Sequence, residues 1–322
     1  MFTNSNNAGR TEIYQCPMDM TDINSTSLRG TLHRDEPMSR HTSWRTGGTA
    51  ENYYIPADLD DLCNYMAGIK PGEAITWVGL GSNILVRDGG LHGHVISVTG
   101  VLDQIDVHDN SLITAGAGVT CAKLARTSAS AGYAGLEFFA GIPGTVGGAL
   151  AMNAGAFGSE TWQFVSKVTT LDRSGKTRQR SREEFETGYR QVNLPVNEWF
   201  IDATFQLFQD KASRAQEQIK LFLSQRTATQ PTGQSSCGSV FRNPEGNYAG
   251  RLIDECGLKG RTIGAAKVSG KHANFIINEG GASAAEIEDL ILLIQKSVRE
   301  MTGIWLEPEV KIVGERNAGL QS

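Results

Sequence analysis

The sequence has no long hydrophobic run and little that would suit a secreted or nucleic-acid-binding protein. No apolar stretch approaches the roughly 18 residues that span a bilayer, and residues 1–20 contain no apolar signal segment. The five cysteines show no Cys-x-x-Cys spacing, which argues against a disulfide framework and a zinc site. The net charge of −5 offers no basic field for nucleic acid or an anionic membrane. These absences predict a cytoplasmic protein without membrane insertion or a nucleic-acid partner, and we expect a monomer.

A resident metal ion is also not expected. His92 and His94 alternate along a predicted strand and could therefore share one of its faces. No carboxylate or third histidine lies near them in the sequence to complete a set of ligands. We predict that the chain holds no metal.

Glycine is present in excess, at 37 of 322 residues, which is about 11% against a usual share of roughly 7%. Eight of these glycines lie in residues 132–158, whose other residues are mostly apolar and whose one charged residue is Glu137. Flexible linkers are polar, so this segment is not typical of a linker. Glycine disfavours both helix and strand but lets bare backbone approach a ligand and present N–H groups to an anion. We interpret the segment as a buried wrap around a large cofactor, with neither a stable helix nor a good strand.

A second glycine-rich loop, GLGSNI at residues 79–84, follows a predicted strand. It falls short of the dinucleotide-binding fingerprint, because Ile84 replaces the third glycine and the next residues resemble a strand instead of a helix. Together with GIPGTVGG at residues 141–148, however, it provides two loops of backbone N–H groups. This pair suits a pyrophosphate flanked by two large ring systems.

The pattern of predicted elements divides the chain into successive regions. Strands and short helices alternate up to about residue 209, and a charged helical segment follows, which places a boundary near residues 209–211. A capping box begins a strong amphipathic helix at Ser283, and a terminal strand is expected at residues 306–312. The expected regions are a polar arm (1–40), a domain of two subdomains split near residues 100–110 (41–209), a C-terminal domain (210–315) and a tail (316–322).

Three polar residues outside the glycine-rich loops are candidates for catalysis. Their spacing alone does not distinguish a catalytic role from a structural one. Ser239 fits an ordinary turn serine, because no Gly-x-Ser-x-Gly elbow surrounds it. Arg190 follows the acidic stretch 183–186 and fits a surface ion pair as well as a site residue. Glu309 lies beside apolar Val310 in an alternating strand and fits a solvated carboxylate.

The order of the motifs resolves this ambiguity, because residues 28–314 closely resemble the UDP-N-acetylenolpyruvoylglucosamine reductase family. The resemblance implies an α+β fold of the vanillyl-alcohol-oxidase (PCMH) type, with two FAD-binding subdomains and a C-terminal α+β substrate-binding domain. It also implies NADPH-dependent reduction of an enolpyruvyl group in peptidoglycan synthesis. The motifs that carry it are HTSWRTGG (41–48), GLGSNILV (79–86), GLEFFAGIPGTVGGALAMNAGAFG (135–158), GYR (188–190), QPTGQSSCGSVFRNP (230–244), AGRLIDECGLKG (249–260), KVSGKHANFIIN (267–278) and LEPEVKIVG (306–314).

The resemblance further implies roles for individual residues. Arg190 and Glu309 would stabilise the enolate-like charge that develops on the substrate, and Ser239 would donate a proton to the carbon that carries it. Substrate binding would involve Tyr189, Gln230 and Asn243. Noncovalent FAD would be held by Gly79, Gly81, Ser82, Asn83, Ile84, Gly141, Ile142, Pro143, Gly144, Thr145, Gly147, Gly148, Asn153, Ala154 and Gly155.

Two departures from the family pattern concern the substrate site. Many members have a serine two residues after the arginine, where this chain has Val192. The sequence therefore does not identify the groups that support the Arg190 side chain. The interval of 49 residues between Arg190 and Ser239 resembles the family's short form, which lacks a loop with a substrate-clamping tyrosine. The sequence therefore also does not identify the segment that covers the substrate diphosphate.

Two other functions are alternatives. A sugar or lactone oxidase on the same fold often tethers its flavin through a histidine after a glycine pair, whereas Gly47-Gly48 is followed here by Thr49. The other alternative is a nucleotide-sugar-binding protein without redox activity, which would lack the flavin colour.

Overall fold

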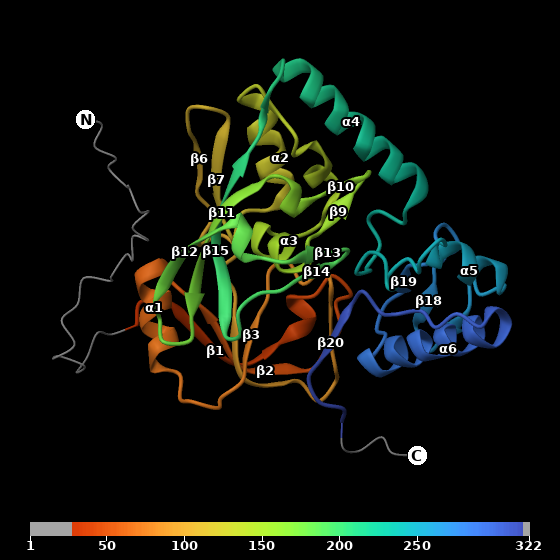
Figure 1. Cartoon of the computed structure of the whole chain (residues 1–322). Helices are drawn as coiled ribbons and strands as arrows, with labels where there is room; N and C mark the ends of the chain where they lie inside the picture. The colour runs from red at the N-terminus through yellow and green to blue at the C-terminus, as the bar shows by residue number, and fades with distance from the viewer. Residues whose placement is uncertain (1–27, 318–322) are drawn as a thin grey trace, which may run out of the picture.

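The computed structural model describes residues 28–317, which form two α+β subdomains and a C-terminal domain (Figure 1). The first subdomain contains a sheet with strand order β1-β2-β5-β3, in which β1 is antiparallel to β2 and the other pairs are parallel. The Asp58 side chain accepts the Asp61 N–H and thereby caps the helix α1. The bounds are β1 (Thr31–Pro37), β2 (Thr49–Ile55), α1 (Leu59–Gly68), β3 (Ile75–Trp77) and β5 (Leu91–Ile96).

The presence of β1 corrects the expected extent of the N-terminal arm. Six residue pairs join β1 to β2, from Thr31 opposite Ile55 to Pro37 opposite Thr49. The strand was missed because it is an edge strand, with its first five residues exposed, and therefore shows no apolar alternation. The ordered fold thus begins before residue 40, and the remainder of the predicted arm, residues 1–27, lies outside the described residues.

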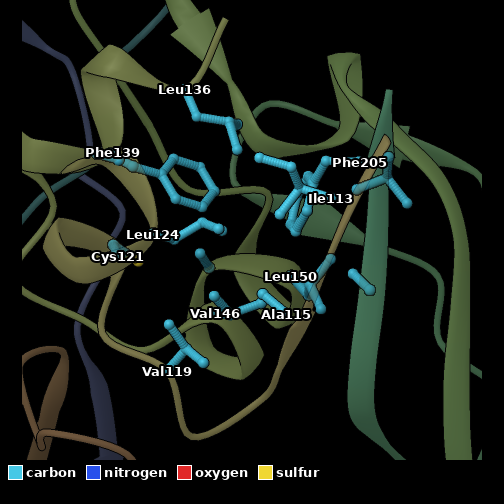
Figure 2. Packing of buried hydrophobic residues seen from close by; sticks show 14 of the residues in the cluster. Ile113, Ala115, Val119, Cys121, Leu124, Leu136, Phe139, Val146, Leu150 and Phe205 are labelled. Atoms are coloured by element: carbon cyan, nitrogen blue, oxygen red, sulfur yellow. The ribbon is translucent and has the colours of Figure 1, made fainter. Parts of the chain in front are cut away.

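The second subdomain is an antiparallel sheet with strand order β12-β11-β15-β7-β6, covered by helices. Its core joins the sheet residues Ile113 and Phe205 to Leu124, Leu136 and Phe139 (Figure 2). The chain passes from the first sheet to this one between β5 and β6. The main bounds are β6 (Ile105–Val107), β7 (Leu112–Gly116), α2 (Cys121–Ser130), η2 (Glu137–Gly141), α3 (Val146–Met152), β11 (Val165–Asp172), β12 (Thr177–Ser181) and β15 (Glu198–Gln206).

The helix α4 (Ala212–Thr229) packs differently from the expectation. Its buried residues Ala215 and Ile219 belong to the core of the second subdomain, and it contacts α2 and η2. Figure 1 shows it along the outer edge of that subdomain, running toward the C-terminal domain. The C-terminal domain was expected to begin at residue 210, but α4 is a part of the second subdomain because its apolar face is buried there.

The glycine-rich segment also contains more regular structure than expected. Residues 146–152 form the helix α3, which Thr145 caps by accepting the Gly148 N–H and which Asn153 ends in a left-handed conformation. Two of its N–H groups are bound by a neighbouring loop, because Val146 donates to Val119 and Gly147 to Ala117. These tertiary hydrogen bonds outweigh the low helix propensity of two successive glycines.

The C-terminal domain packs the helices α5 and α6 with an antiparallel sheet of order β17-β18-β19. The predicted capping box at Ser283 is confirmed, and Gly303 ends α6 with a φ of +76°. Met301, in the last turn of α6, is 65% exposed. The bounds are α5 (Ala249–Glu255), β17 (Thr262–Ile263), β18 (Ala266–Val268), β19 (Ile276–Asn278) and α6 (Ala284–Thr302).

The last strand returns from this domain to the first subdomain. β20 (Lys311–Val313) pairs in parallel with β4 (Ile84–Val86), so the terminal strand is shorter and later than the expected residues 306–312. The short elements are η1 (Met38–Arg40), β8 (Tyr133–Ala134), β9 (Gly155–Ala156), β10 (Ser159–Glu160), η3 (Thr161–Gln163), η4 (Arg182–Glu184), β13 (Thr187–Gly188), β14 (Gln191–Val192) and β16 (Phe208–Gln209).

Specific hydrogen bonds join the C-terminal domain to the first subdomain. The Trp44 indole N–H donates to the Ile276 carbonyl at 2.8 Å and is fully buried. The Asp88 carboxylate accepts the N–H groups of Ala284 and Ala285, each at 2.9 Å, at the N-terminus of α6. The two units are therefore fixed relative to each other. No helix among residues 28–317 is both long and apolar enough to cross a bilayer.

Candidate active site

A cavity of about 290 Å³ lies where the two subdomains and the C-terminal domain meet, and it gathers most of the predicted site residues. Its walls come from the loop 79–84, the loop 141–145, α3, the hairpin β13–β14, the turn 237–239 and the chain just before β20. Arg190, Ser239 and Glu309 all line it. Of the residues expected to hold FAD, those that line it are Gly79, Gly81, Ser82, Asn83, Ile84, Gly141, Ile142, Pro143, Gly144, Thr145, Gly148, Ala154 and Gly155.

The loop 79–83 presents unpaired backbone donors to this cavity. Gly81 has a φ of +60°, and a Cβ there would clash with the His41 carbonyl oxygen, so only glycine fits. Within residues 28–317, none of the five N–H groups from Gly79 to Asn83 donates a hydrogen bond. Unpaired N–H groups beside a cavity fit a diphosphate, and the apolar side chains of Val78 and Ile142 in the same cavity fit flat rings. The residues present therefore suit FAD.

Gly147 and Asn153 do not line the cavity, although both were expected at the cofactor. A Cβ at Gly147 would lie 2.9 Å from the Ala117 Cβ, so this glycine allows α3 to pack against a neighbouring loop. The Asn153 side chain is buried and donates to the Gly188 carbonyl at 3.0 Å, while its oxygen accepts the Trp162 N–H. These two residues support the walls of the site.

Arg190 and Glu309 form an ion pair at the cavity wall. The Arg190 Nε–H donates to Glu309 Oε1 at 2.9 Å, and one terminal nitrogen donates to the Gly155 carbonyl at 2.8 Å. Arg190 lies between β13 and β14 with a φ of +56°, a strained conformation for a residue with a side chain. Main-chain carbonyl oxygens therefore support its guanidinium. Val192, where the family resemblance implies a serine, packs against the apolar core.

Burial raises the pKa of Glu309 above its ordinary value, and this effect exceeds the opposing influence of Arg190. The Asn83 side-chain amide donates to the Glu309 carbonyl at 3.1 Å, and the Lys311 N–H donates to the Asn83 carbonyl. The loop that presents free N–H groups is thus tied directly to the segment that carries Glu309. A carboxyl with a raised pKa can serve as an acid.

Ser239 lies in a turn after Gly238, whose φ of +71° places it in the left-handed region. The next residue, Val240, accepts the Glu309 N–H at 2.7 Å, which places Ser239 and Glu309 on adjacent chain segments. Burial raises the pKa of the Cys237 thiol to about 12, which disfavours the thiolate that a nucleophile needs.

The three residues expected to bind substrate differ in position. Gln230 lines the cavity. Tyr189 is 46% exposed outside it, with its ring 5.0 Å from the Arg190 guanidinium carbon. The Asn243 side chain accepts the Ala249 N–H at 3.1 Å, at the start of α5, and so is already engaged in capping.

Sequence reasoning missed two cationic residues of the cavity, Arg226 and Lys311. Arg226 lies four residues before Gln230, one helical turn away, and this spacing could have indicated it. His92 and His94 do not share a site, because His94 contacts Tyr65 at 2.8 Å while His92 is exposed. No group of three or more metal-ligating side chains occurs in the described part of the chain.

Two sequence profiles match separate parts of this architecture. Residues 50–180 match the FAD binding domain. With the cavity and its free N–H groups, this match defines an FAD-dependent oxidoreductase and confirms the expected α+β FAD-binding fold. Residues 230–313 match the UDP-N-acetylenolpyruvoylglucosamine reductase, C-terminal domain, which begins directly after α4. The chain belongs to the UDP-N-acetylenolpyruvoylglucosamine reductase family.

Full-length relatives agree with this assignment. The UDP-N-acetylenolpyruvoylglucosamine reductase of Methylococcus capsulatus is 53% identical over 290 residues, covering 90% of this chain and 95% of that protein. The protein of the same name from Alkalilimnicola ehrlichii is 54% identical over 286 residues, covering 89% and 96%. The solved structure of the Thermus caldophilus reductase gives a TM-score of 0.75 at 30% identity, covering 89% of this chain and 99% of that one.

Proposed function

We propose that this chain catalyses the NADPH-dependent reduction of the enolpyruvyl group of UDP-N-acetylglucosamine enolpyruvate to UDP-N-acetylmuramate, with FAD as cofactor, in peptidoglycan synthesis. Family membership supports the activity. The observation that carries the assignment of roles is the meeting of Arg190, Ser239 and Glu309 at the cavity formed by the two glycine-rich loops.

The cofactor would be held by the loops 79–84 and 141–145. Their N–H groups would bind the diphosphate of FAD, and the apolar wall would contact its rings. When bound, FAD supplies the transfer of hydride from NADPH to the substrate. Gly47-Gly48 is followed by Thr49, so no histidine tether is present there and the cofactor is noncovalent. Acid denaturation should release all flavin from the precipitated protein.

Each catalytic side chain acts on charge or protons at the substrate. The Arg190 guanidinium, whose side chain is mostly buried, would stabilise the negative charge that develops toward the substrate carboxylate. Glu309, with its raised pKa, can carry a proton near the same group. The Ser239 hydroxyl makes no hydrogen bond within residues 28–317, which leaves it free to donate a proton to the enolate-like carbon.

The variant Ser239→Ala tests this division of roles. Anaerobic stopped-flow absorbance should show flavin reduction by NADPH within a fewfold of the parent rate, because no substrate carbon is protonated in that step. Reoxidation by UDP-N-acetylglucosamine enolpyruvate should slow by about 10²-fold or more, as expected for a lost general acid. If both half-reactions slow equally, or if neither slows, Ser239 is a structural turn residue.

We further propose that the chain acts as a monomer in the cytoplasm. Arg190, Ser239 and Glu309 meet at one cavity within a single chain, so a site of this composition needs no residue from a second copy. Light scattering of the purified holoenzyme tests the oligomeric state, and a mass near twice the chain's 34.8 kDa would contradict a monomer.

A further inference from the structure

The turn that carries Arg190 depends on contacts from outside its own hairpin. Arg190 lies between β13 and β14, which are joined by two residue pairs. Its φ of +56° is in the left-handed region, and a residue with a side chain stays there only where surrounding contacts hold it. The hydrogen bonds of Arg190 to Glu309 and to the Gly155 carbonyl hold its guanidinium. The main chain of the turn requires a contact of its own.

Arg242 reaches this turn from the chain segment that pairs with the segment of Glu309. The Val240 carbonyl accepts the Glu309 N–H at 2.7 Å, and the Arg242 N–H donates to the Glu307 carbonyl at 2.9 Å. These two bonds fix the main chain of Arg242 relative to Glu309. From there, one terminal nitrogen of the Arg242 guanidinium donates to the Arg190 main-chain carbonyl at 3.4 Å. Arg242 thus links the two segments that carry Arg190 and Glu309, by a route separate from the ion pair between them.

The remaining contacts of Arg242 place its guanidinium behind the cavity wall. Its other terminal nitrogen lies 3.9 Å from the Glu307 carboxylate, whose side chain is 71% exposed, and a pair of this kind contributes little. The Nε–H is buried, and it has no acceptor in the described part of the chain. Arg242 does not line the cavity. Burial raises the pKa of Glu309, and the charges of Arg190 and Arg242 both oppose this rise. Arg242 therefore acts on the ion pair from its outer side.

We propose that Arg242 is a positioning residue, which fixes the Arg190 turn against the segment of Glu309 and keeps the two side chains within hydrogen-bond distance. The inference rests on the proposed function, because that function gives both side chains a role at the substrate. A guanidinium suits this position, since its fork can bind two acceptors at once and it keeps its charge. A displacement of reacting groups by about 1 Å can slow a reaction by about 10²-fold, so support from outside the cavity affects the rate.

Hydrogen exchange of the holoenzyme tests whether Arg242 holds the turn. Arg242→Met removes the guanidinium. Arg251→Met is the matched control, because Arg251 is also in the C-terminal domain but is 58% exposed and pairs with Glu255 on its own helix. Amide exchange in a peptide covering residues 186–193, measured by mass spectrometry, should rise by about 3- to 10-fold in Arg242→Met, the range for one lost hydrogen bond. It should keep the parent rate in Arg251→Met. A change below about twofold in Arg242→Met, or an equal rise throughout the chain, would overturn the proposal.

Stopped-flow absorbance tests whether this link serves the reaction. In Arg242→Met, reoxidation of the reduced flavin by the enolpyruvyl substrate should slow by about 10-fold. Flavin reduction by NADPH should stay within about twofold, because Arg190 and Glu309 act on charge that forms only in the second half-reaction. In an Arg190→Met background the same substitution should change reoxidation by less than about twofold, because Arg242 acts through Arg190. Unchanged reoxidation in the single variant, or further slowing in the double variant, would contradict a positioning role.

A second variant, Arg242→Gln, keeps a polar side chain and replaces Arg242→Met if that protein does not fold. The shorter amide does not reach the Arg190 carbonyl, so the same rise in exchange is expected at residues 186–193. Exchange within about twofold of the parent rate in Arg242→Gln would overturn the proposal. If the enolpyruvyl substrate does not reoxidise the flavin of the parent enzyme, the proposed function fails, and hydrogen exchange alone then decides whether Arg242 holds the turn.

Discussion

Two buried arginine–glutamate pairs in this chain have the same composition and opposite properties. Arg180 on β12 and Glu198 on β15 meet through two hydrogen bonds of 2.8 and 2.6 Å, and Glu198 also accepts the Thr170 hydroxyl at 2.7 Å. Arg190 and Glu309 share one hydrogen bond of 2.9 Å, because another nitrogen of Arg190 donates to a main-chain carbonyl. In both pairs the side chains are at most 16% exposed.

The pKa shifts of the two carboxyl groups follow from this difference. Burial raises the pKa of Glu198, but the hydrogen bonds from Arg180 and Thr170 outweigh burial, and the net pKa lies below the ordinary value. Burial raises the pKa of Glu309, and its single charged hydrogen bond does not compensate. A neighbouring arginine is thus insufficient by itself to keep the pKa of a buried carboxyl from rising. Glu198 accepts three side-chain hydrogen bonds and Glu309 accepts one, and the opposite directions of their pKa shifts follow this difference.

The largest expected effect comes from removing the carboxyl group at the cavity. Glu309→Ala should slow flavin reoxidation by the enolpyruvyl substrate by about 10²- to 10³-fold, because it removes a group positioned where charge develops. Glu309→Gln should slow reoxidation less, since the amide N–H can donate a hydrogen bond in place of the O–H of a protonated carboxyl. Stopped-flow absorbance measures both rates, and Glu198→Gln serves as the control with unchanged kinetics. Loss of the same size in Glu198→Gln would erase the contrast between the two pairs.

The structural pair should instead determine stability. Glu198→Gln should lower the free energy of unfolding by about 2–3 kcal/mol at pH 7, near the lower end for a broken buried pair, because Arg180 keeps Glu184 as a partner. The folded pKa of Glu198 is depressed, so its contribution is complete above the ordinary value of 4.5 and is lost as pH falls through the folded pKa. Urea denaturation at pH 7 and at pH 4 should therefore show a smaller difference in acid. A constant difference would contradict the linkage.

Glu309 should make a smaller contribution to the pH dependence of stability, with a sign opposite to that of Glu198. Its folded pKa is raised, so folding favours the protonated form, and the parent protein should lose stability as pH rises from the ordinary value of 4.5 through the folded pKa. Glu309→Gln does not ionise and should escape that loss. Urea denaturation of both proteins between pH 4 and pH 8 should show the variant gaining relative stability with pH. If the parent protein instead gains stability relative to the variant as pH rises, the folded pKa of Glu309 is depressed like that of Glu198.

The sequence predicted elements whose ends carry local signals. Ser283 caps α6 as expected, because a cap depends on residues within one turn. The site was predicted largely through motif order, which brought Arg190, Ser239 and Glu309 together although 119 residues separate the first from the last. Their spacing alone was compatible with three unrelated surface residues.

Elements that depend on distant partners were predicted less well. The helix α3 forms despite its glycines because the loop 117–119 binds its first N–H groups. The placement of α4 follows from a few apolar residues, including Ile219, that face α2 and η2, and no local pattern names that partner. The edge strand β1 has no apolar face to recognise. In each case a tertiary contact outweighs local propensity.

The pairing of β20 with β4 has a consequence for the order in which the protein becomes competent during synthesis. Glu309 is held beside Asn83 by the pairing of β20 with β4. The ribosome synthesises β20 more than 220 residues after Asn83. A ribosome-bound chain that has already folded both subdomains still lacks the carboxyl group at the cavity and one wall around it. Acquisition of activity is therefore among the last events in the maturation of the nascent polypeptide, however early its cofactor loops become ordered.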